Sequence, residues 1–292
     1  MKLIRSIALL SSLAAVTGCG MVSTRSTRAP AGPSVSTGEV VAVFRQGQPP
    51  APADSSWSQA PVYTVPLLTQ NMLDPKLMVP STPEVRVQAI TDGSQVSFRL
   101  EWDDSSRDDL LAAGRQADAC AIQVAAHNET GAAPSPIMGN PRRPVEIAYW
   151  SASWQATVDG RPDNIQAFYP GATVDSYPFA AAAPDKQEEM AILYAPTRSL
   201  GNDRGGPRKQ SVEDLVAEGP GSLRPAAQAI SQGQGVRTAR GWAVVISRPL
   251  PDGWTPGSRA NVAFAIWQGA AHEIGSRKMR SVWVPISIGR RS

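Results

Sequence analysis

Two side chains far apart in the chain could donate an electron pair to a metal. Met138 stands in a loop bounded by prolines, Pro134-Ser-Pro-Ile-Met-Gly-Asn-Pro141, and offers a soft thioether. Lys278 stands at the start of the last predicted strand, and its amine is a donor only where the ammonium form is suppressed. Taken singly, a loop methionine is more often a packing residue, and a lysine at a strand edge is more often a solvated charge. Only the rest of the sequence can indicate whether these two residues bind the same metal.

The two histidines, His127 and His272, are the competing donors, because imidazole is a common ligand of metals and haem. Each alone is typical of a surface loop. No Cys-x-x-Cys-His motif occurs, which excludes covalent attachment of a c-type haem. A His127–His272 pair stays open on residue type and spacing.

Five motifs, in a fixed order, give the chain a family resemblance between Trp57 and Ile288. The chain resembles the haem b (gamma) subunit of molybdenum enzymes of the type II dimethyl sulfoxide reductase family. That group includes ethylbenzene dehydrogenase, dimethyl sulfide dehydrogenase, and selenate and chlorate reductases. The motifs are Ser135-Pro-Ile-Met-Gly139, Val145-Glu-Ile-Ala-Tyr-Trp150, Val212-Glu-Asp-Leu-Val-Ala-Glu-Gly219, Gly241-Trp-Ala-Val-Val-Ile-Ser-Arg248 and Arg277-Lys-Met-Arg-Ser-Val-Trp283.

In that family a methionine and a lysine are the axial ligands of one haem b, and the matching positions here are Met138 and Lys278. Neither histidine matches a family motif. With both axial positions filled, the iron has no open site for a substrate, so the resemblance implies a non-catalytic subunit that transfers single electrons. The implied partners are a molybdenum catalytic subunit, an iron–sulfur subunit, and an external carrier such as a c-type cytochrome.

Other residues could complete a haem site. Propionates need cationic or hydrogen-bonding partners, and Arg280, Arg277 and Arg240 are the candidates, with Arg280 preferred. Aromatic side chains could wall the pocket, although each is more often a core residue. The aromatic candidates are Tyr149, Trp150, Trp154, Trp267 and Trp283.

The N-terminus is typical of an exported lipoprotein. A basic start and a short apolar run predict a signal peptide over residues 1–18. Val16-Thr-Gly-Cys19 resembles a lipobox, which implies cleavage before Cys19 and acylation of its thiol; the alternative is an ordinary signal peptide with an incidental cysteine. Residues 19–53 are predicted to be a lipidated flexible tether. We therefore expect a periplasmic protein anchored to the outer membrane, with Cys120 as a buried free thiol.

Composition and alternation predict an all-β fold, an antiparallel β-sandwich with short helical insertions over residues 54–292. Charged residues are 18% and hydrophobic residues 42% of the chain, and Pro (26) and Gly (24) indicate many turns. The net charge of +3 is spread along the chain, so no nucleic-acid partner is expected. The strands are expected at 57–68, 84–90, 95–102, 119–125, 145–156, 191–194, 242–248, 261–268 and around Val282, Val284 and Ile286, with a helical turn or two at 212–218.

Two details of this prediction can be checked directly. Asp92-Gly93 is expected to turn the hairpin between the second and third strands. The acidic residues Asp103, Asp104, Asp108 and Asp109 fit no EF-hand spacing, so a solvated turn is expected rather than a calcium site.

Two other functions remain open from sequence. One is a lipid-anchored, non-haem β-sandwich that binds a carbohydrate-like ligand, which the tryptophans favour. The other is a haem protein that acts alone as a sensor or carrier. A haem absorption band would exclude the non-haem carbohydrate-binding protein. Co-purification of partner subunits would exclude the haem protein that acts alone.

Overall fold

The structure is a computed structural model that describes residues 38–112, 114–126, 133–162, 169, 171, 184–186 and 208–291. These residues belong to one unit that begins at Pro33. Its strands are β1 (Val40–Phe44), β2 (Tyr63–Pro66), β3 (Leu68–Thr69), β4 (Glu84–Thr91), β5 (Gln95–Asp103), β6 (Ala119–Ala125), β7 (Val145–Ser151), β8 (Val212–Ala217), β9 (Arg224–Pro225), β10 (Gln232–Arg237), β11 (Gly241–Pro249), β12 (Arg259–Trp267), β13 (Met279–Arg280) and β14 (Val284–Ile288). The helical elements are α1 (Ala152–Val158) and the 3-10 turns η1 (Ser55–Gln59), η3 (Pro184–Lys186) and η5 (Gly269–Ala271).

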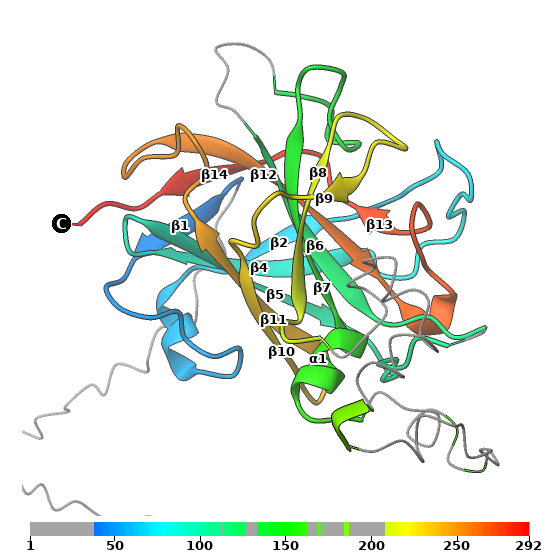
Figure 1. The fold of residues 1–292 in the computed structure, drawn as a ribbon. Coiled ribbons are helices and arrows are strands. Elements are labelled where there is room, and N and C mark those ends of the chain that lie inside the picture. The colour runs from blue at the N-terminus through cyan, green and yellow to red at the C-terminus, as the bar shows by residue number, and fades with distance from the viewer. Residues whose placement is uncertain are drawn as a thin grey trace, which may run out of the picture. The chain divides into compact units, whose positions relative to one another are not determined.

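The strands form two layers around one apolar core, which confirms the all-β sandwich (Figure 1). The strand order is β10-β11-β5-β4-β1-β14-β12-β6-β7-β8-β9. Phe98 of β5 packs edge-on against Phe264 of β12, with ring centroids 6.1 Å apart, and Trp102 of β5 packs in the same way on Trp150 of β7. These contacts join the layers across the core.

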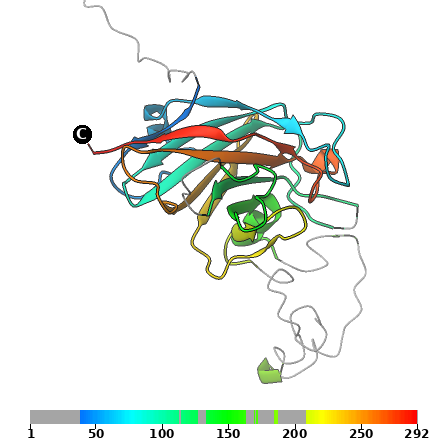
Figure 2. The ribbon, with the colours of Figure 1, turned by 90° about the horizontal axis from the view of Figure 1, so that it is seen from above.

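Pairing is antiparallel apart from β1, which runs parallel to both β4 and β14. In Figure 2, β1 (blue) and β14 (red) lie side by side. The tether expected over residues 19–53 therefore overlaps the sheet, and the folded part begins earlier than the predicted residue 54. The apolar sequence Val-Val-Ala-Val-Phe of β1 was not recognised as a strand, because the Pro, Gly and Ser residues around it are typical of a flexible tether.

The predicted hairpin is confirmed. Strands β4 and β5 pair antiparallel around Asp92 and Gly93, and Gly93 has a φ of +93°, which glycine adopts without strain. The Asp92 carboxylate accepts the Ser94 and Gln95 amides. The alternating apolar side chains of the two strands are all buried: Val85, Val87, Ala89, Val96, Phe98, Leu100 and Trp102.

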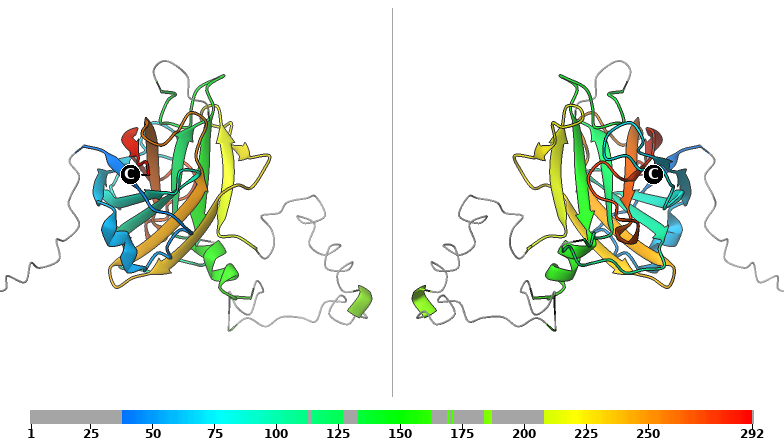
Figure 3. Two further views of the ribbon diagram at one scale, coloured as in Figure 1. Left: turned by 90° about the vertical axis from the view of Figure 1, so that its left-hand side faces the viewer. Right: turned by 90° about the vertical axis from the view of Figure 1, so that its right-hand side faces the viewer.

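Two predicted elements are wrong. Residues 212–218 were expected to form a helical turn or two, but Val212–Ala217 is strand β8, and its six residues pair with β7. The strand expected over 145–156 ends at Ser151, and helix α1 follows at the end of the sheet (Figure 3). In both places long-range pairing and packing override local pattern.

Two further predicted strands differ in their bounds, and a third is not tested. The segment 57–68 divides into η1 and β2, with β3 beginning at Leu68. The final strand is split into β13 and β14, and Val282 between them is 53% exposed rather than on a buried face. The strand expected at 191–194 lies outside the described residues.

Candidate functional site

The cavity has its floor on the outer face of the layer formed by β13, β12, β6, β7 and β8, opposite the core. Alternation sends Cys120, Ile122 and Phe264 into the core and leaves the intervening side chains on the outer face. There the cavity has a volume of about 770 Å³. Its floor consists of two rungs of paired residues, Ala263–Gln123–Ile147–Leu215 and Arg280–Ala265–Ala121–Tyr149–Glu213.

Three alanines make the middle of this floor flat. Ala263, Ala265 and Ala121 end at Cβ, so they leave the space above them open, and the aliphatic Ile147 and Leu215 continue the surface. These residues were not singled out from sequence as a site. Alanines at alternate positions of a strand look like ordinary packing residues, and only the register between strands brings them together.

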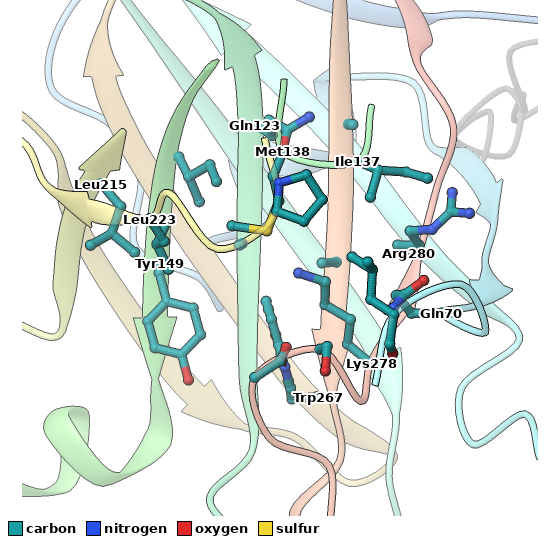
Figure 4. Close-up of a pocket in the computed structure, with 18 of the residues that line it drawn as sticks. Gln70, Gln123, Ile137, Met138, Tyr149, Leu215, Leu223, Trp267, Lys278 and Arg280 are labelled. Carbon is teal, nitrogen blue, oxygen red and sulfur yellow. Dashed lines mark hydrogen bonds between the residues drawn. The ribbon is translucent and has the colours of Figure 1, made fainter. Parts of the chain in front are cut away.

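Met138 reaches into this cavity from the loop between β6 and β7 (Figure 4). Its backbone is left-handed, with φ of +62°, and Gly139 follows at +80°. A Cβ on Gly139 would lie 2.8 Å from the Arg143 carbonyl oxygen, so only glycine fits. The Gly139 amide donates to the Ser135 carbonyl at 2.9 Å and closes the turn.

The Met138 loop is fastened to neighbouring strands and loops through its backbone carbonyls. Trp283 Nε1 donates to the Pro134 carbonyl at 2.6 Å, and Gln123 Nε2 donates to the Pro136 carbonyl at 3.1 Å. The Met138 carbonyl itself accepts the Gly219 amide at 2.7 Å. The thioether is therefore held by a rigid loop.

Lys278 lies immediately before β13 and reaches into the same cavity (Figure 4). Its carbonyl accepts the Gln70 amide at 3.0 Å, which fixes the backbone. Its Nζ lies 4.9 Å from the centroid of the Trp267 ring. Among the described residues, this amine has no hydrogen-bond or ion-pair partner. Burial, together with the charge of Arg280, lowers the pKa of Lys278 from 10.5 to about 8, so the neutral amine is accessible.

Arg280 also lines the cavity, as the sequence suggested. Burial lowers the pKa of its guanidinium, and its Nε is buried without a hydrogen-bond partner among the described residues. An anionic group of a ligand would satisfy this donor. The other two candidates do not line the cavity: Arg240 pairs with Asp103 at 2.6 Å, and the Arg277 side chain is placed outside the lining.

Three of the five aromatic candidates wall the cavity. Tyr149 packs edge-on against both Trp154 and Trp267, at centroid distances of 5.3 and 5.2 Å. Trp150 instead points into the core, where its Nε1 donates to Gln155. Trp283 does not line the cavity; its Nε1 donates a hydrogen bond to the Met138 loop. Because the strand expected over 145–156 ends at Ser151, Trp154 lies on helix α1 whereas Trp150 lies on β7.

Of the alternative His127–His272 pair, the structure describes only His272. His272 is exposed at the end of η5 and does not line the cavity, while His127 lies outside the described residues. Cys120 is a buried free thiol, as expected, and burial raises its pKa. Cys19 lies outside the described residues.

The acidic segment Asp103–Asp109 is solvated only in part, because Asp103 is exposed at the end of β5 and Asp104 is not. Asp104 is buried, and its Oδ1 accepts the Ser106 amide at 2.9 Å. Asp118 is also buried, accepting bonds from Gly269, Asp108 and Trp242. Burial, with the charge of Asp104, raises the pKa of Asp118 to about 7. Across the described residues, no group of three or more His, Cys, Asp or Glu side chains could hold a metal ion.

Fold and cavity together define a ligand-binding β-sandwich whose site lies on the outer face of one layer. The chain belongs to the ethylbenzene dehydrogenase family, whose family model matches residues 54–279. It is 26% identical over 257 residues to a Haloferax mediterranei protein named "Putative respiratory nitrate reductase heme subunit ORF7", and the match covers 86% of this chain and 72% of that protein.

Two solved structures show a weaker likeness. Both are a carbohydrate-binding module of family 9 from Caldicellulosiruptor kristjanssonii, at 8% identity and with 87% of this chain covered. The complex with cellotriose has a TM-score of 0.40 and is covered to 94%, and the complex with glucose has a TM-score of 0.37 and is covered to 96%. No helix in the described ranges is long and apolar enough to cross a membrane.

Proposed function

We propose that this chain is the haem b subunit of a respiratory molybdenum oxidoreductase and relays single electrons without catalysing a reaction itself. The observation that carries the proposal is that Met138 and Lys278, from segments 140 residues apart in sequence, line the same cavity. Membership of the ethylbenzene dehydrogenase family and the name of the Haloferax relative support haem as the ligand.

The residues of the cavity fit a haem b. Its volume of about 770 Å³ and its apolar floor suit a large flat ligand. Met138 would supply a thioether and Lys278 a neutral amine to the iron, and Arg280 would hold a propionate through its unpartnered Nε. Bound haem supplies one-electron redox chemistry. Met138 and Lys278 would orient it, and the aromatic wall of Tyr149, Trp154 and Trp267 would exclude water from it.

The electron would pass between an iron–sulfur subunit, whose own partner carries molybdenum, and an external carrier such as a c-type cytochrome. We further propose that the mature chain begins at Cys19, is acylated there, and is held in the periplasm at the outer membrane. The lipobox-like Val16-Thr-Gly-Cys19 and the basic, apolar N-terminus support this placement.

The test is spectroscopic. The purified full-length protein should show a Soret band and a b-type pyridine haemochrome, and Met138→Ala and Lys278→Ala should each lower haem retention or change the spin state. His272→Ala serves as the control and should leave the spectrum unchanged. A colourless protein that binds sugar would replace the proposal with a carbohydrate-binding function, and a bis-histidine ferric spectrum would remove the assigned ligands.

A further inference from the structure

Trp267 ends β12 and forms the part of the cavity wall beside Lys278. Its side chain is buried and lines the cavity. The Lys278 Nζ lies 4.9 Å from the centroid of its ring, and Figure 4 shows the two side chains next to each other. Because no hydrogen bond or ion pair joins this nitrogen to another described residue, the ring face is the electron-rich surface that the amine meets.

The same indole fastens the backbone that leads to Lys278. Its Nε1 donates to the Gly275 carbonyl at 3.0 Å and so holds the turn between β12 and β13. Lys278 follows Gly275 closely in the chain, and its own carbonyl accepts the Gln70 amide at 3.0 Å. The backbone before Lys278 is therefore held by Trp267, and the backbone at Lys278 by Gln70.

The Trp267 ring is itself held in place. Tyr149 of β7 packs edge-on against it, with the ring centroids 5.2 Å apart. Pairing with Ala119 of β6 fixes the backbone from which the ring projects. A ring packed in this way presents a fixed face to the amine.

The face of an aromatic ring is negatively polarised, so it attracts the hydrogens of a nitrogen and repels a lone pair. A neutral amine has two hydrogens and one lone pair. Over Trp267 the hydrogens are drawn toward the ring, which turns the lone pair of Lys278 toward the open side of the cavity. A donor held in this way is prepared for a metal before the metal binds.

We propose that Trp267 is a positioning residue for the Lys278 amine: its ring directs the lone pair into the cavity, and its N–H holds the turn that leads to Lys278. This inference rests on the proposed function and names the group that prepares one of its two donors. Trp154 belongs to the same wall, but the Arg208 guanidinium lies over its ring, 4.0 Å from the centroid. The two tryptophans therefore separate the positioning of Lys278 from the general enclosure of the cavity.

The experiment compares three variants of the full-length protein. Trp267→Leu removes the ring and the N–H, whereas Trp267→Phe keeps a ring and removes the N–H alone. Trp154→Leu is the matched control, because it removes the same kind of side chain from the same wall. The measurements are haem content, the low-spin fraction of the ferric spectrum, and the affinity of the ferrous protein for carbon monoxide, which binds iron where a protein donor is weakly held.

We expect Trp267→Leu to bind carbon monoxide at least about tenfold more tightly than the wild type and to lose low-spin character, with about a threefold effect in Trp267→Phe. Trp154→Leu should stay within about twofold of the wild type. In a Lys278→Ala background, Trp267→Leu should have no further effect, because the residue that it positions is gone. Equal effects of Trp267→Leu and Trp154→Leu, or an undiminished effect without Lys278, overturn the proposal.

A second measurement needs no haem and no variant. The Trp267 ring current should shift the ε-methylene protons of Lys278 upfield in NMR spectra of the apoprotein, where the five lysines of the chain give few signals. The shift should persist in Trp154→Leu and vanish in Trp267→Leu. Its absence from the wild type overturns the contact and the inference with it. A wild type that shows the shift but binds no haem overturns the proposed function, and the donor role of Lys278 with it, but not the contact.

Discussion

At the scale of single residues, the small side chains of the floor decide what the cavity can hold. Ala265 lies between Arg280 and Ala121 in the second rung, so a larger side chain there would project into the cavity. We expect Ala265→Phe to reduce haem retention about tenfold, because an inserted ring costs about 1–3 kcal/mol when the space must also hold a ligand. The measurement is haem content after dialysis against a haem-binding competitor.

The matched change at the same position is Ala265→Ser, which adds one oxygen and leaves the floor nearly flat. It should retain haem like the wild type. Phenylalanine is favoured in strands, so the fold should persist in both variants. Full haem retention in Ala265→Phe would mean that the ligand does not occupy the space above this rung.

The buried carboxyl of Asp118 predicts how stability depends on pH. Its folded-state pKa of about 7 lies above the ordinary value of 3.8, so the folded protein holds a proton that the unfolded chain has lost between these values. The free energy of unfolding should therefore fall as pH rises from about 4 to 7, by on the order of a few kcal/mol, and then level off. Urea unfolding of the apoprotein at a series of pH values measures this slope.

Asp118→Asn should flatten that slope, since an amide does not titrate. The control is Asp103→Asn. Hydrogen bonding to Arg86 lowers the pKa of the Asp103 carboxyl, so its contribution has the opposite sign and its loss should leave the decline in place. An unchanged slope in Asp118→Asn would show that another group titrates in this range.

At the scale of elements, the Met138 loop depends on a donor from outside it. Trp283→Phe keeps an aromatic ring but removes the Nε1 hydrogen bond to the Pro134 carbonyl. We expect haem retention to fall roughly fivefold and the haem potential to shift, because such a bond contributes about 1 kcal/mol and here orients a ligand. Redox titration and haem content measure the two effects.

The control for this change is Trp57→Phe. Trp57 Nε1 donates to the Ala51 carbonyl at 3.0 Å, so the same bond is lost from a tryptophan that does not line the cavity. It should cost similar stability and leave the haem potential unchanged. Equal shifts in both variants would make the Trp283 effect a general loss of stability.

The local sequence pattern correctly predicted the strands that have one apolar and one polar face. It failed for a strand whose two faces are both apolar. Strands β4 and β5 alternate cleanly around an Asp-Gly turn, so both register and buried faces were predictable. Strand β8 has apolar residues at Val212, Leu215 and Val216, a spacing that suits a helix, because its outer face also packs on an apolar cavity. A cavity on the outside of a sheet thus removes the alternation that sequence analysis depends on.

The candidate site was predictable only in part. Met138 and Lys278 were identified by family resemblance, and residue type alone would have favoured the histidines. The alanine floor, Gln70 and Gln123 carry no sequence signal, because their role follows from strand register and loop closure. Arg280 was separated from Arg240 only by tertiary structure, which pairs Arg240 with Asp103.

At the scale of the whole molecule, the residues that fill the core of the sandwich are separate from the residues that line the cavity. Side-chain pairs such as Phe98 and Phe264 fill the core between the layers, whereas the cavity lies on the opposite face of one layer. Substitutions in the floor can therefore change binding without opening the core.

The N-terminal sequence predicts that this domain is attached to a membrane through Cys19. We expect Cys19→Ser to move the protein from the membrane fraction to the soluble fraction, because an acylated cysteine with several chains binds membranes stably and an unmodified serine does not. The haem spectrum should be unchanged, since the cavity is built from residues 70–281. Cys120→Ala is the control: it removes the chain's other cysteine, which is buried in the core, and should stay in the membrane fraction. Cell fractionation, with the haem absorption band as the marker, measures this distribution. A Cys19→Ser protein that remains in the membrane fraction would contradict the proposed lipid anchor.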